Sequence, residues 1–321
     1  MTASTLSLPV TRAADLADVP TERRWLVAQL WSDEAVGIVG GEPKCCKSFL
    51  ALDLAVAVAS GAPCLRRFPV ARTGRVLLFA AEDALHVVRQ RLAGIARAAG
   101  RDLADLDIQV ITAPSVRLDV ERDRDALTET VARLRPRLLV LDPFVRLHRI
   151  DENLSGEVAP LLAYLRELQR RYHVAVVLVH HARKGGAKLR AGQALRGSSE
   201  FHAWGDSNLY LRRHGDQLGL SVEHRAAPSI STVSLQLDTR DDAVALTAID
   251  HAPAALATAA PVELALDQRI LAELEVAAAP LSATALRQRC QIRNATLQAA
   301  LLALVADGRL RKDRAGYAVA R

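Results

Sequence analysis

Short apolar runs alternate with amphipathic segments between residues 36 and 181. The runs are nearly continuous in Val, Leu and Ile, which is typical of strands buried on both faces. The segments between them repeat apolar residues with the period of an α-helix. We therefore expect a parallel sheet covered by helices on both faces. The expected strands are 36–39, 75–80, 108–112, 137–142 and 174–180, and the expected helices are 47–59, 86–99, 123–134 and 157–172.

The pattern changes after Asp206. The segments NLYLRR, LGLSVEH, VSLQLD and AVALTAI alternate apolar and polar residues, which predicts antiparallel strands that extend the sheet. Residues 251–261 are rich in Ala, Pro and Thr and predict a linker. Residues 262–321 predict three helices and a two-stranded hairpin, the order of a winged helix-turn-helix domain. Residues 1–20 lack periodicity and predict a flexible arm, which leaves residues 21–250 as the main domain.

Composition excludes few classes of protein. The net charge is +6, from 42 Lys and Arg against 36 Asp and Glu, and this balance suits nucleic-acid binding as well as an ordinary enzyme. The longest apolar run, near residues 50–59, contains Asp53, and the first twenty residues lack a signal-peptide pattern. The four Cys show no CxxC spacing, so they indicate neither a zinc site nor a disulfide framework. We expect a cytoplasmic protein with no membrane partner.

The first strand leads into a Gly-rich turn that has the spacing of a phosphate-binding loop. Four residues separate Gly41 from position 46, and Lys47 and Ser48 then open an apolar helix. Free N–H groups at such a helix start bind phosphates, the lysine reaches the β- and γ-phosphates, and the serine hydroxyl holds Mg²⁺. We therefore expect ATP and Mg²⁺ as ligands, although a turn that merely caps a core helix remains an alternative. The expected nucleotide-binding residues are Gly41, Glu42, Pro43, Lys44, Cys45, Cys46, Lys47, Ser48 and Phe49.

One residue of this loop departs from the motif. Cys46 stands where a Gly is expected, and its Cβ either fits with mild strain or weakens nucleotide binding. Cys45 and Cys46 also precede Lys47 at a helix N-terminus, an environment that lowers the pKa of a thiol and suggests redox control. The alternative is that small residues in a tight loop have no redox role.

Two carboxylates end neighbouring strands of the predicted sheet. Asp142 is placed to order Mg²⁺ through Ser48 or a water, and otherwise it caps a loop. Glu82 is placed to polarise the water that attacks the γ-phosphate. Asp83 is the alternative to Glu82, although we expect it to cap the following helix.

The next strand ends in His180 and His181, one of which can bind the γ-phosphate and report its loss. We favour His181, because side chains alternate along a strand and one of the two faces the core. The loop at 182–199 is cationic and contains four glycines, which suits a strand of nucleic acid as well as a solvated surface. The expected DNA-binding residues are Arg183, Lys184, Lys188 and Arg190 in this loop, and Arg293, Thr296, Gln298, Arg311, Lys312 and Arg314 in the winged helix.

Taken in order, six segments resemble the RecA-like ATPases (AAA ATPase family) of the plasmid replicative helicase RepA type, over roughly residues 25–250. They are WLVAQLW, GGEPKCCKSFLALDLAVAVASG, GRVLLFAAED, LLVLDP, VHHARKGG and LRGSSEFHAWGD. The resemblance implies an α/β P-loop NTPase fold and a hexameric ring or filament, with ATP between subunits and single-stranded DNA in the channel. It also implies the roles given above for Lys47, Ser48, Glu82, Asp142 and His181.

Besides Cys46, the chain departs from this family at the arginine that completes a neighbouring subunit's site. Asp206 stands at that position, and a later segment, Glu223-His224-Arg225, replaces the Lys-x-Arg finger of related ring ATPases. Arg225 is therefore the candidate finger and the third expected catalytic residue. The leading hypothesis is a DNA-associated ATPase, either a replicative helicase or a mobile-element motor. The alternative is a DNA-binding regulator or scaffold whose ATPase site is weakened.

Overall fold

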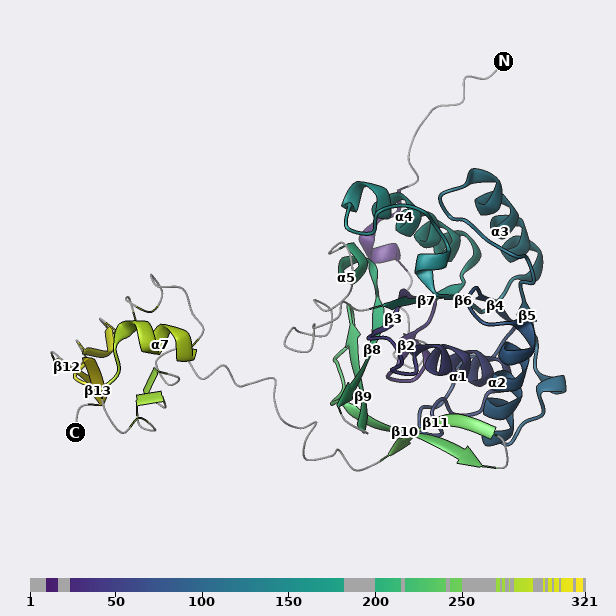
Figure 1. Ribbon diagram of the computed structural model, residues 1–321. Coiled ribbons are helices and arrows are strands. Elements are labelled where there is room, and N and C mark those ends of the chain that lie inside the picture. The colour runs from purple at the N-terminus through teal and green to yellow at the C-terminus, as the bar shows by residue number, and fades with distance from the viewer. Residues whose placement is uncertain are drawn as a thin grey trace, which may run out of the picture. The chain divides into compact units, whose positions relative to one another are not determined.

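In the computed structural model the chain forms two compact units, Met1–Ala257 and Thr258–Arg321 (Figure 1). The structure describes residues 10–16, 24–181, 200–214, 217–240 and 243–249 of the first unit, and parts of 270–319 of the second. The expected linker at 251–261 lies outside the described residues, as does most of the expected arm at 1–20.

The described part of the first unit contains eleven strands and five α-helices. The strands are β1 (Trp25–Val27), β2 (Trp31–Ser32), β3 (Val36–Gly41), β4 (Val76–Ala80), β5 (Ile108–Val110), β6 (Leu138–Asp142), β7 (Ala175–His181), β8 (Ser207–His214), β9 (Gln217–His224), β10 (Val233–Arg240) and β11 (Ala243–Ile249). The helices are α1 (Lys47–Ser60), α2 (Leu85–Ala98), α3 (Glu121–Leu134), α4 (Ser155–Tyr172) and α5 (Glu200–Trp204), with 3-10 turns η1 (Ala13–Asp15), η3 (Leu103–Asp105) and η4 (Phe144–Arg146).

Nine strands form one sheet in the order β11-β10-β9-β8-β3-β7-β6-β4-β5, while β1 and β2 pair separately. The strands from β8 to β5 are parallel, and β9, β10 and β11 continue the sheet as antiparallel strands. The predicted mainly parallel α/β sheet is therefore confirmed. The strand direction reverses between β8 and β9, one strand later than expected. Alternation of apolar and polar residues reports a half-buried strand but does not report its direction.

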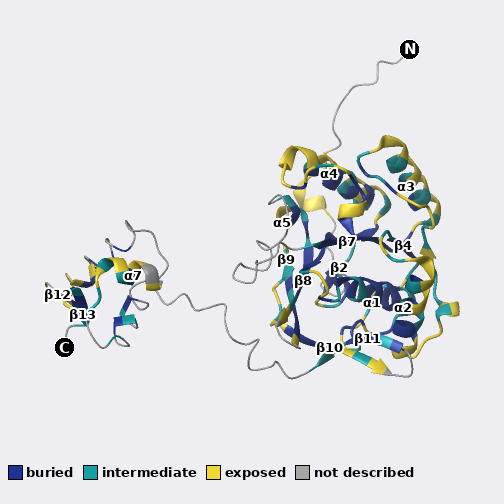
Figure 2. Ribbon diagram, viewed as in Figure 1, coloured by how far each residue is buried: buried dark blue, intermediate teal, exposed yellow. Residues whose placement is uncertain are grey.

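Helices cover both faces of this sheet (Figure 1). The core on one face contains α1 and α2, and the core on the other face contains α3 and α4. Helix α1 is buried along most of its length, because it is apolar around its whole circumference (Figure 2). The sheet also curls far enough for β11 to reach α2, since a Cβ on Gly94 would lie 3.2 Å from the Val244 nitrogen.

The second unit contains α7 (Ala283–Cys290) and a hairpin of β12 (Leu310–Asp313) and β13 (Gly316–Val319). Ser282 precedes α7, and its Oγ accepts a hydrogen bond from the Ala285 nitrogen at 3.2 Å, as expected for a capping residue. A small core joins α7 and the hairpin to further helical residues. These elements match the predicted order of helices and hairpin, and the winged-helix assignment itself stays a prediction. Within the residues that the structure describes, no helix combines the length and apolarity needed to cross a membrane.

Candidate nucleotide site

The phosphate-binding loop connects the end of β3 to the start of α1. All six residues of β3 are buried, which fixes the position of Gly41 at the edge of the sheet. Gly41 has a φ of 154°, and a Cβ there would lie 2.5 Å from the Leu211 carbonyl oxygen and 2.6 Å from the Cys45 Sγ. The first glycine of the motif is therefore required by its surroundings.

Cys46 adopts the left-handed conformation, with φ 66° and ψ 26°, as the N-cap residue of α1. An L-residue in this region costs roughly 1–2 kcal/mol relative to the right-handed one. The Cys46 side chain packs against the hydrophobic core, and its Sγ lies 3.6 Å from Nη2 of Arg213. Cys in place of Gly therefore strains the backbone of the loop, although the Cys46 side chain packs against the core and contacts Arg213.

Lys47 begins α1 and is only 6% exposed. Its Nζ donates a hydrogen bond to the Glu42 carbonyl oxygen at 2.8 Å, across the loop. Burial lowers the pKa of Lys47, while the negative charges of Asp142 and Glu82 oppose this shift. The ammonium group therefore lies close to both predicted carboxylates.

Asp142, the last residue of β6, is buried beside the start of α1. Burial raises the pKa of Asp142 to about 6, a hydrogen bond from Ser48 opposes the rise, and the neighbouring charges of Asp83 and Glu82 add to it. One hydroxyl and one carboxylate in contact form a donor pair that suits Mg²⁺, because this ion takes few protein ligands and completes its shell with phosphate oxygens and water. Among the described residues, no group of three or more His, Cys, Asp or Glu could hold a metal ion.

Glu82 lies just beyond β4 and is partly exposed. Its Oε1 accepts a hydrogen bond from Nε of Arg146, in η4, at 3.0 Å. This ion pair could not be predicted from the sequence, because 64 positions separate the two residues. The expectation that Asp83 caps α2 is wrong, since Ala84 is the N-cap residue and no side chain caps this helix. Asp83 instead forms an ion pair with Arg91, in the second turn of α2.

The two histidines lie on β7, directly beside the phosphate loop. The register pairs Gly40 with His180 and Gly41 with His181. His180 is buried and stacks on Phe201, with ring centroids 4.3 Å apart. His181 is less buried and lies next to the first residue of the loop. This placement favours His181 as the residue that faces a bound phosphate.

Arg225 does not join the other predicted site residues within one chain. Its backbone nitrogen donates to the Asp206 carbonyl oxygen at 2.9 Å, and its guanidinium contacts the Ala203 carbonyl and the Asp206 carboxylate. Asp206 in turn accepts a hydrogen bond from the Val36 nitrogen at 3.2 Å. Arg225 therefore lies at the amino end of β3, about 16 Å along the strand from Gly41.

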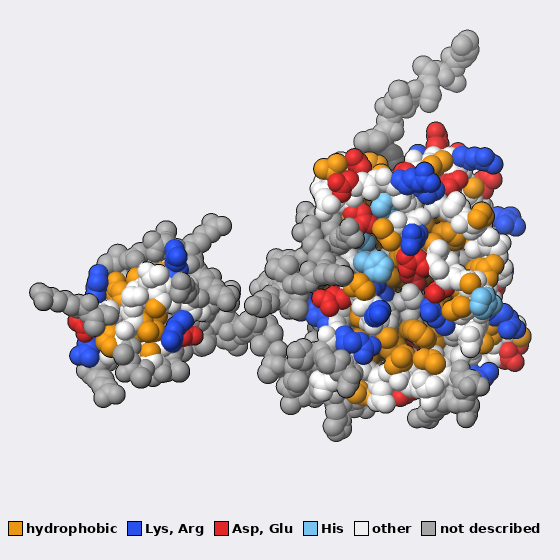
Figure 3. All heavy atoms as spheres, in the orientation of Figure 1, with side chains coloured by type: hydrophobic (Ala, Val, Ile, Leu, Met, Phe, Trp, Pro, Cys, Tyr) orange, Lys and Arg blue, Asp and Glu red, His pale blue; other side chains and the backbone are white. Residues whose placement is uncertain are grey.

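Most of the predicted DNA-binding residues lie outside the described residues; these are Arg183, Lys184, Lys188, Arg190, Arg293, Thr296, Gln298 and Arg314. Arg311 and Lys312 are exposed on β12, and the Lys312 ammonium lies 5.4 Å from the centre of the Tyr317 ring. On the face seen in Figure 3, basic side chains of the first unit are interspersed with acidic ones. This face does not present one continuous basic surface.

The prediction of a reactive thiol at Cys45 is wrong. Cys45 is buried, and burial raises the pKa of its thiol even though Lys47 is close. Desolvation of the thiolate outweighs the charge of the lysine. Cys45 is a small residue of the loop whose side chain packs into the core.

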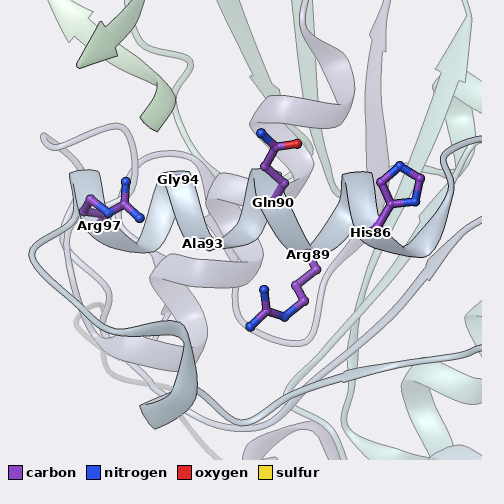
Figure 4. Close-up of a pocket in the computed structure, with 6 residues that line it drawn as sticks. All are labelled: His86, Arg89, Gln90, Ala93, Gly94 and Arg97. Carbon is purple, nitrogen blue, oxygen red and sulfur yellow. The ribbon is translucent and has the colours of Figure 1, made fainter. Parts of the chain in front are cut away.

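A pocket of about 320 Å³ lies elsewhere, along α2 (Figure 4). It is lined by His86, Arg89, Gln90, Ala93, Gly94 and Arg97. All six residues belong to one helix, and none of them is a predicted nucleotide-binding residue. The phosphate loop, rather than this pocket, therefore defines the candidate site.

A family model described as an AAA domain matches residues 2–187, more than half of the 321 residues. The fold is similar to that of a DnaB-like replicative helicase, solved in a study of its interactions with primase. The TM-score is 0.51 at 15% identity, and the match covers 66% of this chain and 57% of the helicase chain. The RadB recombinase gives a TM-score of 0.49 at 16% identity, over 66% of this chain and 90% of that one. The chain has the α/β fold of RecA-like P-loop proteins and belongs to the AAA domain family.

Proposed function

We propose that this protein is an ATPase that binds Mg²⁺ and ATP at the phosphate loop and hydrolyses the γ-phosphate. One observation carries the proposal: the Lys47 ammonium is buried within the electrostatic reach of Asp142 and Glu82, and Ser48 donates to Asp142. A lysine, a hydroxyl and two carboxylates that meet at the start of a helix fit a polyphosphate and its cation.

Each side chain then has a defined task. The N–H groups that begin α1 and the Lys47 ammonium bind the phosphates. Ser48 and Asp142 hold Mg²⁺, which neutralises phosphate charge when it is bound. Glu82 accepts the proton of the attacking water as ADP leaves, and for this it must release Arg146. His181 is the candidate contact to the γ-phosphate.

We further propose that the partner is DNA, single-stranded in the main domain and duplex at a C-terminal winged helix. The basic residues predicted at 182–199 and in β12 support this proposal, as does the fold shared with a replicative helicase. A homo-oligomer, either a ring or a filament, is supported by Arg225, which one chain holds at the end of β3 remote from its own phosphate loop. A helicase or a mobile-element motor are the roles that suit such an assembly. We propose that the protein works in the cytoplasm.

The alternative is a DNA-binding regulator or scaffold with a weakened ATPase site. The strained backbone of Cys46 favours it, because this strain falls on the loop that must hold the phosphates. The two proposals differ in one respect: a regulator binds duplex DNA equally with and without ATP.

The test is the rate of phosphate release from ATP, with and without single-stranded DNA, for the wild type and Lys47→Ala. The expected result is a rate that DNA stimulates and that Lys47→Ala abolishes. Arg122→Ala, which removes an exposed cationic side chain on α3 that has no proposed role, is the matched control and should keep the wild-type rates. The proposal is overturned if the wild type binds no nucleotide and Cys46→Gly restores no binding.

A further inference from the structure

We propose that Arg213 is a second cationic contact for the nucleotide, supplied by the same chain, and that it binds the α-phosphate. This inference rests on the proposed nucleotide site. Arg213 was not predicted from the sequence, because it lies near the end of β8, far from the phosphate-loop motif along the chain.

The position of Arg213 follows from the sheet. Strand β8 is parallel to β3, and the register pairs Gly41 with Leu211, so both strands end at the edge that carries the phosphate loop. Leu209 and Leu211 are buried in the core that contains α1, whereas Tyr210 is buried in the opposite core. Because side chains alternate along a strand, Arg213 projects on the face of α1.

The contact with Cys46 brings the guanidinium to the start of that helix. Nη2 of Arg213 lies 3.6 Å from the Cys46 Sγ, and a neutral thiol is a weak hydrogen-bond acceptor. The amino end of a helix carries a partial positive charge, so a cation placed there is unfavourable by itself. Lys47 adds a second positive charge beside it. An anion bound between the guanidinium, the amino end of α1 and the Lys47 ammonium would be attracted by all three and would offset their mutual repulsion.

The order of the strands indicates which phosphate Arg213 meets. Strands β7, β6 and β4 bring His181, Asp142 and Glu82 to one side of β3, whereas β8 lies on the other side (Figure 1). Hydrolysis requires the γ-phosphate to face Glu82. The opposite end of the polyphosphate then points toward β8, where Arg213 lies. The geometry therefore assigns Arg213 to a group that ATP and ADP share.

Cys46 acts as the positioning residue for Arg213. A Gly at this position would offer no side chain, whereas the thiol contacts the guanidinium and keeps it over the loop. Cys46, the residue that departs from the motif, therefore contacts a residue that lies 167 positions further along the chain.

The test compares the dissociation constants of ADP and of a non-hydrolysable ATP analogue for the wild type, Arg213→Ala and Arg213→Lys. Loss of a charge-assisted contact weakens binding about 10- to 100-fold. The expected result is an equal loss for both nucleotides in Arg213→Ala and a smaller loss in Arg213→Lys. Arg212→Ala is the matched control, because this neighbour projects on the other face of the sheet, and it should stay within about twofold.

Two outcomes overturn the assignment. Unchanged affinity for both nucleotides in Arg213→Ala means that this residue makes no contact, and a loss for the ATP analogue alone means that it reads the γ-phosphate. Lys47→Ala is measured beside these variants and separates this failure from that of the proposed site. If Lys47→Ala abolishes nucleotide binding and Arg213→Ala leaves it unchanged, the proposed nucleotide site is retained and only the role of Arg213 is refuted.

A double-mutant cycle tests the role of Cys46. The losses of affinity caused by Cys46→Ala and Arg213→Ala should not add, because the two side chains touch. Strictly additive losses would overturn the positioning role. If Arg213→Ala fails to fold, as judged by circular dichroism, Arg213→Gln and Arg213→Lys carry the same comparison.

Discussion

Replacing Asp142 by Asn should stabilise the protein at neutral pH while it destroys the proposed cation site. Burial raises the pKa of this carboxyl from 3.8 to about 6. The folded state therefore holds the proton more tightly than the unfolded state does, and stability is lost as the pH rises from the unfolded pKa toward the folded one. Above pH 6 the folded protein carries a buried charge that it would be more stable without.

The size of the effect follows from the shift. One pKa unit corresponds to about 1.4 kcal/mol, so the ionised carboxylate lowers the free energy of unfolding by about 3 kcal/mol at pH 8. About half of this loss has developed at pH 5. Asn cannot ionise, and its side-chain oxygen can still accept the hydrogen bond from Ser48. Asp142→Asn should therefore raise the free energy of unfolding by about 3 kcal/mol at pH 8 and by about 1–2 kcal/mol at pH 5.

The assay is urea unfolding between pH 5 and pH 8, without nucleotide or Mg²⁺, followed by tryptophan fluorescence. All three Trp residues, at positions 25, 31 and 204, belong to the first unit, so the signal reports that unit alone. Asp105→Asn, at an exposed position in η3, is the control and should change stability by less than about 0.5 kcal/mol. A variant that is no more stable than the wild type at pH 8, or equally stabilised at pH 5 and pH 8, would refute the reasoning.

Three further predictions concern the loop and its neighbours. Arg146→Gln frees Glu82 and should raise the rate of ATP hydrolysis without DNA, by no more than about fivefold, because exposed ion pairs contribute less than about 1 kcal/mol; a lower rate would contradict this role. Cys46→Gly relieves the left-handed strain and should raise the free energy of unfolding by up to about 1 kcal/mol in urea titrations, and a clear loss of stability would speak against it. Cys45 should react with iodoacetamide at pH 8 far more slowly in the folded than in the unfolded protein, and equal rates would show that its thiol is accessible.

The strands of the parallel part of the sheet could be predicted from the sequence. They are buried on both faces and therefore consist of nearly uninterrupted apolar runs. The phosphate loop was found for a related reason: its spacing lies within eight consecutive residues, from Gly41 to Ser48. The ends of the elements were predicted less accurately. Strand β7 extends to His181, one residue beyond the predicted end, because its pairing with β3 continues to Gly41.

The adjacency of the strands that end at Glu82 and Asp142 was predicted, but other contacts between distant segments were not, because they depend on how those segments meet. The parallel pairing of β8 with β3 was missed, and with it the approach of Arg213 to Cys46. The ion pair between Arg146 and Glu82 joins two loops that are adjacent only because β6 lies beside β4. The raised pKa of Cys45 depends on the burial of its side chain in the core, which the local sequence pattern does not report.

The bond between the Lys47 ammonium and the Glu42 carbonyl has a kinetic consequence. It spans the loop and fixes its ends, while Gly41, Lys44 and Cys46 already have positive φ values. When a polyphosphate binds, Lys47 would donate to a phosphate oxygen in place of the Glu42 carbonyl oxygen. Little of the loop would then have to become ordered on binding. Nucleotide association should therefore be limited by diffusion and not by rearrangement of the loop, and the observed rate should rise linearly with nucleotide concentration without reaching a plateau.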